Sequence, residues 1–434
     1  MNKFMAWMEK HFIPIAAKIG AQRHLVAIRD GFVSIMPLIM AGAFAVLINN
    51  LPIKPFQTFM SNSFGEAWWK GFGGDIWNAT FAIMSILIVF TISYSLARSY
   101  ESDGLAAGVI SFASLLMLYK SSGADWAIPY GYLGTQGLFV SIAVALIVTS
   151  IFVKLLGNQR LVIKMPDGVP PAVARSFAAL LPSIIILVLV TSFRHVLLAL
   201  NIEDIHASIF WTIQKPLQGL VSSLPALLLI IFIQQLLWFF GLHGSNILAP
   251  IINALFLPLL TANTDAFNLG KANADIPNIV SSQFLDSYVN LGGSGATICL
   301  IIAIFMVSRN KANKAIANLG LAPGLFNINE PVQFGLPMVL NPIYFIPFIF
   351  VPILFAIIGY VFTAIGIVPK IVLLAPWTTP PILGAIMSTS SIRGAIIPIV
   401  NIIVGTIIYI PFVKMADKRA EAEAEAVLSQ SIEN

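Results

Sequence analysis

The sequence predicts an all-α polytopic membrane protein with about ten transmembrane helices, re-entrant hairpins and interfacial amphipathic helices. Only 10% of its 434 residues are charged and 58% are hydrophobic, whereas a soluble domain has about 25% charged residues. The mean hydropathy of +0.89 supports the same assignment. Several apolar runs approach the roughly 20 residues that cross a bilayer core. We expect spans at 31–49, 77–97, 104–118, 136–156, 177–200, 221–240, 245–260, 291–307, 341–365 and 393–413.

Basic residues in the loops indicate the orientation of these spans. With ten crossings, four basic clusters fall on one side, which the positive-inside rule makes cytoplasmic. Both termini are then cytoplasmic in a multi-pass protein of the cell membrane. The net charge of +5 follows from this topology and gives no reason to expect nucleic acid as a partner. The clusters are Arg23 and Arg29; Lys154, Arg160 and Lys164; Arg309, Lys311 and Lys314; and Lys414, Lys418 and Arg419.

The chain divides into two unlike halves with polar ends. The first 20 residues lack the apolar core and cleavage site of a signal peptide, so we expect none. They mix apolar and charged side chains, as an amphipathic surface helix does. We expect polar connections at 50–76 and 261–290. The predicted units are 1–30 (interfacial N-terminus), 31–200 (N-terminal half), 201–220 (amphipathic connector), 221–415 (C-terminal half) and 416–434 (solvated tail).

The segment 324–335 is the most informative part of the chain. It lies among strongly apolar residues, yet it carries Asn329, Glu330 and Gln333. Pro331 biases the preceding residue away from the helical region, so we expect the backbone to break at Glu330. A carboxylate on broken backbone at membrane depth is costly unless it lines a polar cavity. We therefore interpret this segment as a re-entrant hairpin that carries a functional site rather than as a surface loop.

A second motif covers Trp238 to Asn246. We expect a helix to end at Gly241, and His243 and Asn246 follow before the next apolar run. A lone His is usually structural, but the glycines beside His243 let the backbone approach a ligand. We predict that His243 and Asn246 contact a ligand. Trp238 is either an interfacial anchor or a platform for a sugar ring.

Two further stretches combine small, polar and helix-breaking residues beside apolar spans. One begins at Asn290 and continues through glycines to 295, and the other begins at Trp377. Broken helices whose ends point at the substrate are a recurrent feature of transporters. The alternative is that the small residues pack helices together, and for the glycines both interpretations stay open. We assign Asn290 and Trp377 to the site.

The motifs that are missing narrow the function. The sequence contains no Walker-type loop, no HExxH, no Cys/His metal cluster and no Ser nucleophile elbow. We therefore expect neither a metal nor a cofactor. A site of Asn, Gln, His, Glu and Trp suits a neutral ligand rich in hydroxyl groups. The lone Cys299 lies inside an apolar run, so it is a poor candidate for a phosphate carrier.

These stretches resemble the membrane subunit, enzyme IIC, of the lactose/cellobiose class of bacterial sugar phosphotransferase systems. The resemblance extends over about residues 1–415, and the Asn-x-x-Glu-Pro-Val-x-Phe-Gly element is specific to this and related sugar IIC groups. The matching stretches are 22–32, 165–173, 240–246 and 327–342.

The resemblance implies a homodimer in which 31–200 is the dimerisation half and 221–415 is the substrate-binding and transport half. It implies that His243 and Glu330 correspond to the family's contacts with the sugar 6-hydroxyl and take part in catalysis. It also implies that a phosphocysteine on a separate IIB protein phosphorylates the bound sugar, with a IIA protein and the general phosphocarrier upstream. This chain would then be the membrane subunit of a phosphotransferase complex in the bacterial cell membrane.

Two other functions fit the residues. Glu330 could couple protons in an ion-driven secondary sugar transporter, or the chain could be a membrane enzyme that acts on lipid-linked sugars. If the chain is the membrane subunit of a phosphotransferase system, the expected substrate is a β-linked disaccharide. Cellobiose is our first choice, ahead of diacetylchitobiose and lactose.

Overall fold

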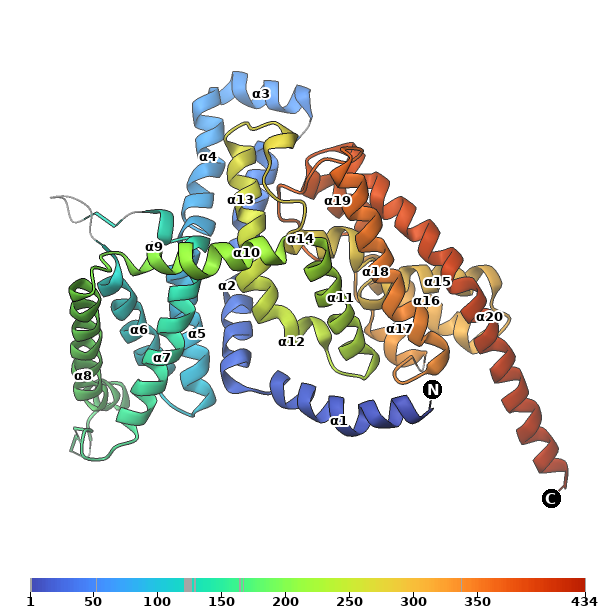
Figure 1. The fold of residues 1–434 in the computed structure, drawn as a ribbon, viewed down its shortest axis with the longest axis horizontal. Helices are drawn as coiled ribbons and strands as arrows, with labels where there is room; N and C mark the ends of the chain where they lie inside the picture. The colour runs from blue at the N-terminus through green and yellow to red at the C-terminus, as the bar shows by residue number, and fades with distance from the viewer. Residues whose placement is uncertain are drawn as a thin grey trace.

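The computed structural model describes residues 2–433, apart from 52, 121–126, 129, 164, 167 and 337. It describes no side chains at 2–6, 8, 9 and 423–433. Lys164, a member of the second basic cluster, lies outside the described residues. The described chain is helical, and its helices form an elongated molecule with α5–α8 at one end and α15–α18 and α20 at the other (Figure 1).

The N-terminal half contains one helix that lies beside the bundle and seven that follow it. They are α1 (Asn2–Gly20), α2 (Arg23–Asn49), α3 (Lys54–Phe64), α4 (Glu66–Asn78), α5 (Met84–Ser99), α6 (Gly104–Leu118), α7 (Leu138–Leu156) and α8 (Pro171–Ala199). Short 3-10 turns are η1 (Phe81–Ile83), η2 (Tyr130–Tyr132) and η3 (Thr135–Gly137).

The connector and the C-terminal half contain shorter and more often broken helices. They are α9 (Ile205–Ile209), α10 (Lys215–Val221), α11 (Leu224–Phe239), α12 (Gly244–Ile251), α13 (Leu257–Asn268), α14 (Ser282–Phe284), α15 (Thr297–Val307), α16 (Lys311–Leu325), α17 (Glu330–Gly335), α18 (Pro342–Ala364), α19 (Pro381–Thr389) and α20 (Ile396–Glu433). Three π-helical segments are η4 (Phe210–Gln214), η5 (Ile252–Phe256) and η7 (Leu285–Val289). Three 3-10 turns are η6 (Asn273–Asp275), η8 (Ser294–Ala296) and η9 (Ile392–Ala395).

Each of the ten predicted spans overlaps a helix. In the described part of the chain, eight helical stretches are long and apolar enough to cross a membrane. A bent pair, Ile205–Val221 with Leu224–Phe239, makes a ninth if it is counted as one span, and its two parts meet at 77°. Helix α6 is apolar but shorter. The prediction of many apolar helices is therefore confirmed, although their ends differ from the predicted ones.

The helices extend beyond the apolar runs. Helix α2 begins at Arg23, where the side chain of Gln22 accepts a hydrogen bond from Leu25 N. The expected polar connection at 50–76 is mostly helical, since it holds α3 and most of α4. The connection at 261–290 likewise contains the end of α13, then α14 and η7. Hydropathy marks only the part of a helix that suits hydrocarbon, whereas backbone hydrogen bonding continues into polar sequence.

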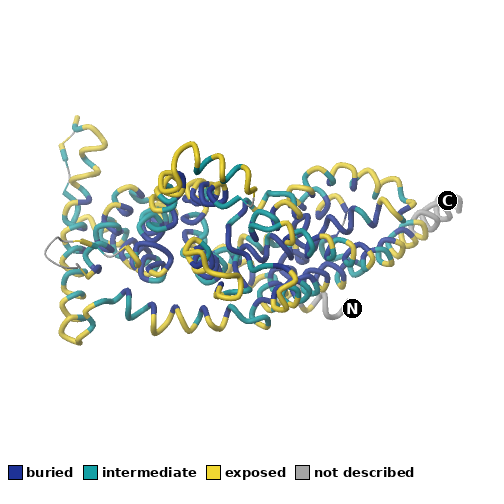
Figure 2. The backbone as a smooth tube through the Cα atoms, turned by 90° about the horizontal axis from the view of Figure 1, so that it is seen from above, coloured by how far each residue is buried: buried dark blue, intermediate teal, exposed yellow. Residues whose placement is uncertain are grey.

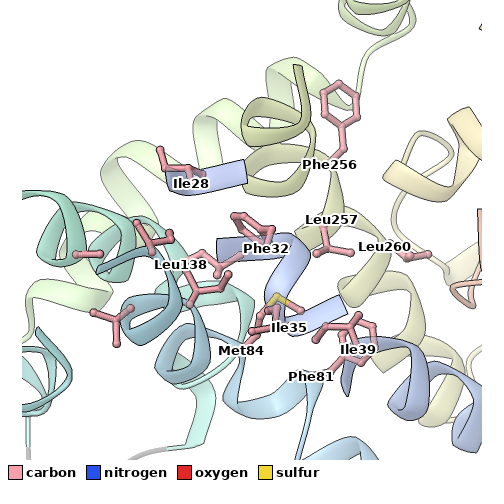
Figure 3. Packing of buried hydrophobic residues seen from close by; sticks show 14 of the residues in the cluster. Ile28, Phe32, Ile35, Ile39, Phe81, Met84, Leu138, Phe256, Leu257 and Leu260 are labelled. Carbon is pink, nitrogen blue, oxygen red and sulfur yellow. The ribbon is translucent and has the colours of Figure 1, made fainter. Parts of the chain in front are cut away.

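The core of the N-terminal half lies between α2, α5, α6 and α7. In Figure 3, Phe32 and Ile35 of α2 face Met84 of α5 and Leu138 of α7. The same cluster includes Phe256, Leu257 and Leu260, together with residues of α11 and η7. The predicted division at 200–221 is thus crossed by one shared apolar core.

The buried residues of a second core all come from the C-terminal half. It packs α11, α15, α18 and α20 around fully buried side chains such as Phe239, Phe348, Phe355 and Tyr409. Figure 2 shows buried residues through the middle of the molecule and exposed residues along its outer helices. The helix α20 continues past the predicted tail boundary at 415, and Asp417 is still buried.

Both predicted amphipathic segments are helical. Helix α1 lies along the C-terminal half, where the ring of Phe12 is 5.9 Å from that of Phe240 and Ala16 packs in one cluster with Leu237. The connector α9–η4–α10 crosses the molecule between the halves (Figure 1), with Gln214 buried and Trp211 exposed. The buried side of the connector thus includes polar side chains such as Gln214, and its exposed side includes large apolar ones such as Trp211.

Candidate functional site

Four breaks in the C-terminal half bring the polar motifs together. They separate α11 from α12, η7 from α15, α16 from α17, and α18 from α19. Helix α11 ends at Phe239, and Gly241 follows with a φ of 78°. The N–H of Leu242 donates to the carbonyl of Leu237, which is the hydrogen bond of a Schellman helix end. This turn places His243 at the start of the next helix, close to the expected position.

His243 caps helix α12 with its own ring. Its Nδ1 accepts a hydrogen bond from the N–H of Asn246 at 3.2 Å. A neutral imidazole that accepts at Nδ1 carries its proton on Nε2. That Nε2 lies 3.8 Å from Oε1 of Glu330, and the two side chains are 42% and 44% exposed. The pair is thus open to a ligand, with a donor on one side and a carboxylate on the other.

Glu330 is the first residue of the short helix α17. The backbone breaks earlier than we expected, at Asn327, which has a φ of 62°. Pro331 fits the first turn of a helix because the N–H that proline lacks would be unpaired there anyway. The expectation that Glu330 itself leaves the helical region is therefore wrong, but the break does lie within the predicted segment.

Asn329 and Gln333 lie behind Glu330. Asn329 is 4% exposed and donates to the carbonyl of Ser294 at 3.2 Å. Gln333 is 1% exposed and donates to the carbonyl of Trp238 at 3.3 Å. The Oε1 of Gln333 is buried without a hydrogen-bond partner among the described residues. The two amides therefore tie α17 to Ser294 and to the end of α11.

The two Trp residues differ in accessibility. The indole of Trp238 is only 3% exposed, donates to Ser245 Oγ at 3.2 Å, and lies 4.2 Å from the ring of His243. The indole of Trp377 is 50% exposed. The exposed aromatic face is therefore that of Trp377, while the buried Trp238 packs against the ring of His243.

Asn290 belongs to an amide network that the sequence interpretation only partly anticipated. Its Oδ1 accepts from Gln234 at 3.2 Å and from Gln235 at 3.5 Å. Gln235 in turn accepts from the N–H of Gly295 at 2.8 Å. Two adjacent Gln residues inside the apolar helix α11 were the overlooked signal, because uncompensated amides are costly at membrane depth. Asp286 of η7, one turn before Asn290, was also overlooked.

The glycines after Asn290 form a loop. Gly292, Gly293 and Gly295 have φ values of 78°, 98° and 77°, a region that only glycine enters freely. A Cβ added to Gly293 would lie 2.6 Å from that of Asn329. These glycines let the backbone of the loop pass close to Asn329, beside the site.

The site offers a carboxylate, an imidazole and several amides. Among the described residues, no three His, Cys, Asp or Glu side chains are grouped closely enough to hold a metal ion. Cys299 is fully buried. The chemistry available to the chain at this place is hydrogen bonding to hydroxyl groups and proton acceptance by Glu330.

Comparisons with known proteins agree on one family. The family model "Phosphotransferase system, EIIC" matches residues 29–352. The chain is 38% identical to the "Lichenan permease IIC component" of Bacillus subtilis, over 96% of this chain and 95% of that protein. It is also 38% identical to the "PTS system cellobiose-specific EIIC component" of Geobacillus stearothermophilus, over 98% and 97% of the two chains.

A solved structure has the same fold. The crystal structure of the transporter ChbC, the IIC component from the N,N'-diacetylchitobiose-specific phosphotransferase system, superposes with a TM-score of 0.91 at 36% identity. The match covers 96% of this chain and 99% of that one. The resemblance inferred from the sequence and the all-helical multi-pass fold are thereby confirmed. The chain belongs to the EIIC family, the membrane components of sugar phosphotransferase systems, in its lactose/cellobiose class.

Proposed function

We propose that this protein translocates a β-linked disaccharide, with cellobiose as first choice, and presents the sugar 6-hydroxyl to a phosphocysteine of a separate IIB protein. The chain would thus be the permease subunit of the phosphotransferase complex. A IIA protein and the general phosphocarrier would supply the phosphoryl group to IIB. Relatives named for lichenan, cellobiose and N,N'-diacetylchitobiose support this substrate class.

The distance between His243 and Glu330 is the observation that carries the proposal. At 3.8 Å, Nε2 and Oε1 are too far apart for a direct hydrogen bond. A hydroxyl oxygen fits at about 2.8 Å from both atoms, which is normal hydrogen-bond geometry. It would accept from the Nε2–H of His243 and donate its own proton to Glu330. The free lone pair of the oxygen would then be available to attack phosphorus.

The transfer balances with residues of this chain and the partner. The S–P bond of the phosphocysteine breaks as the O–P bond to the sugar forms, and the thiolate of IIB leaves. Glu330 takes the hydroxyl proton as a general base, and His243 holds the oxygen in position. Glu330 then gives this proton to water. Because a phosphate ester carries a charge of about −1.5 to −2 at neutral pH, the regenerated carboxylate repels the product and favours its release.

The other predicted site residues take supporting positions in this proposal. Trp377 offers an exposed aromatic face to a sugar ring, and Asn246 is exposed beside His243. Asn290, Asn329, Gln333 and Trp238 complete the wall behind them. We propose that all eight residues form the sugar site.

Translocation in this proposal requires movement between the halves. The unit 221–415 carries the site, and 31–200 forms the homodimer and stays in place. The basic loops put both termini in the cytoplasm, where IIB can reach the site. The partners are therefore the disaccharide, IIB, a second copy of the chain and the lipid bilayer.

The test is uptake and phosphorylation in membrane vesicles with a panel of β-disaccharides. We expect formation of the sugar 6-phosphate to require phosphoenolpyruvate and the soluble partner proteins, with cellobiose as the best substrate. Uptake of unmodified sugar that a protonophore abolishes would instead indicate a secondary transporter. Sugar product in the lipid fraction would indicate an enzyme of lipid-linked sugars.

A further inference from the structure

We propose that Asn327 is a positioning residue of the sugar site, whose single side chain joins three loops and so sets the places of Glu330 and Trp377. The inference rests on the proposed function for its consequences but on hydrogen bonds for its geometry. Asn327 is 8% exposed, so its amide is directed into the protein. We assign it no contact with the sugar.

The three side-chain hydrogen bonds of Asn327 reach two other loops of the site. Its Oδ1 accepts from the N–H of Gly292 at 2.9 Å. Its Nδ2 donates to the carbonyl of Trp377 at 2.6 Å and to that of Thr379 at 3.0 Å. The loop before α17 is thereby attached to the glycine loop and to the loop before α19, which are 35 and about 50 residues away in the chain.

An asparagine is suited to this position for two independent reasons. One acceptor and two donors on a short side chain are what a primary amide provides, and aspartate would lack both donors. The backbone of Asn327 is left-handed, with a φ of 62°, and Asn is among the few residues besides Gly that adopt this conformation readily. The residue can therefore end the turn and hold the loops at once.

The hydrogen bonds of Asn327 fix the backbone of residues that face the ligand. Glu330 follows Asn327 after only two residues, and Asn329 between them donates to Ser294 of the glycine loop. The exposed indole of Trp377 stands on a backbone whose carbonyl is fixed by Asn327. Releasing that carbonyl lets the aromatic platform move relative to the carboxylate, which lowers affinity by loss of preorganisation.

Two variants of Asn327 remove different sets of its side-chain hydrogen bonds. Asn327→Gly keeps the left-handed backbone and removes all three hydrogen bonds. Asn327→Asp keeps the acceptor for Gly292 but, as a carboxylate, cannot donate to Trp377 or Thr379. The matched control is Asn201→Gly, because Asn201 has a φ of 61° and its side chain hydrogen-bonds no other described residue.

The first measurement reports loop mobility without any sugar. A cysteine is introduced by Thr378→Cys in a Cys299→Ser background, and its reaction with a membrane-permeant maleimide is timed in membranes. We expect both Asn327 variants to react about tenfold faster or more than the parent, consistent with the loss of two hydrogen bonds, and Asn201→Gly to match the parent.

The second measurement is cellobiose affinity by calorimetry, with phosphorylation kinetics. We expect Kd and KM to rise about tenfold or more in both variants, because both lose the two hydrogen bonds to Trp377 and Thr379, with kcat reduced less than KM is raised. Labelling rates and affinities within twofold of the parent would overturn the proposal. So would failure of both variants to fold while Asn201→Gly folds, since Asn327 would then be a residue of the fold. A wild-type protein that neither binds nor phosphorylates any β-disaccharide would refute the proposed function. The labelling comparison would still decide the role of Asn327.

Discussion

His243 has two ring nitrogens with separate tasks. The first, Nδ1, caps α12 by accepting from Asn246 N, and this leaves the Nε2–H for a ligand. Glu330 lies at the start of α17, and its Oε1 is 3.8 Å from Nε2. The local geometry thus selects the tautomer that can donate to a hydroxyl oxygen, while the carboxylate can accept the hydroxyl proton.

Glu330→Gln should preserve the fold and abolish most sugar phosphorylation. Loss of a general base costs about 100-fold or more in rate, whereas the amide keeps the size and the hydrogen-bonding capacity of the side chain. The rate is measured in vesicles with the soluble partner proteins. Glu203→Gln is the control, because Glu203 is 69% exposed and pairs with Lys120 away from the site. A normal rate in Glu330→Gln would remove the residue from the reaction.

His243→Ala should weaken cellobiose binding by about 1–3 kcal/mol, the cost of leaving hydroxyl partners unpaired. This variant also loses the cap of α12, so His243→Asn is made beside it. Asn is a good N-cap but lacks the Nε2–H. Calorimetry should give similar losses for both variants. If His243→Asn binds as well as the wild type, the histidine acts only as a cap.

At the scale of elements, the site depends on where helices stop. Gly241, Gly293 and Asn327 all have positive φ values, and each ends or follows a helix beside the polar cluster. Such ends expose backbone groups and bring side chains from separate helices together. Long uninterrupted helices such as α2 and α18 supply the frame around these breaks.

Gly293→Ala should destabilise the protein more than Gly270→Ala does. Both glycines have positive φ, 98° and 72°, so an alanine is strained at both positions, by about 1–3 kcal/mol. At Gly293 the new Cβ would also overlap Asn329, whereas no described atom lies within 4 Å of a Cβ at Gly270. Overpacking adds about 1–3 kcal/mol. Thermal unfolding in detergent measures the difference, and equal shifts would show that Asn329 moves aside freely.

At the scale of the whole molecule, this chain and its soluble partner divide the work. The chain contains one cysteine, Cys299, which is fully buried between α15 and α20 with Gly405 against it. The apolar core shared by α2, α5, α7 and α13 joins the two predicted halves. The movement between halves that we propose would therefore repack this shared surface.

Cys299→Ser should leave transport and phosphorylation intact. A buried cysteine acts as a small hydrophobic residue, so the substitution affects stability alone. Vesicles that contain the variant and wild-type soluble partners provide the assay. A variant that inserts normally but transfers no phosphoryl group would place Cys299 on the reaction path. It would contradict the assignment of the phosphocysteine to the separate IIB protein.

Green fluorescent protein fused to either end of the chain should fluoresce, because the basic loops predict that both termini are cytoplasmic and this reporter matures only there in bacteria. A cell-surface protease should leave both fusions intact. Loss of fluorescence at one terminus only would mean an odd number of crossings. The connector α9–α10 or the short helix α6 would then be the first segment to reassign.

The sequence by itself determined the membrane fold, the ten apolar regions, the family and the two residues proposed to bind the sugar 6-hydroxyl. Composition and apolar run length are local properties, and a proline after a carboxylate in apolar sequence indicates an unusual site without reference to neighbours. The relation of His243 to Glu330 was predicted through resemblance rather than geometry.

Only the tertiary structure decided which side chains meet and which stay exposed. It distinguished the buried Trp238 from the open Trp377, moved the backbone break from Glu330 to Asn327, and extended helices through sequence that hydropathy assigned to loops. It also revealed that one amide joins loops about 50 residues apart. Such contacts depend on how separate helices pack, and the hydrophobic pattern of one segment carries no information about the partners of its polar groups.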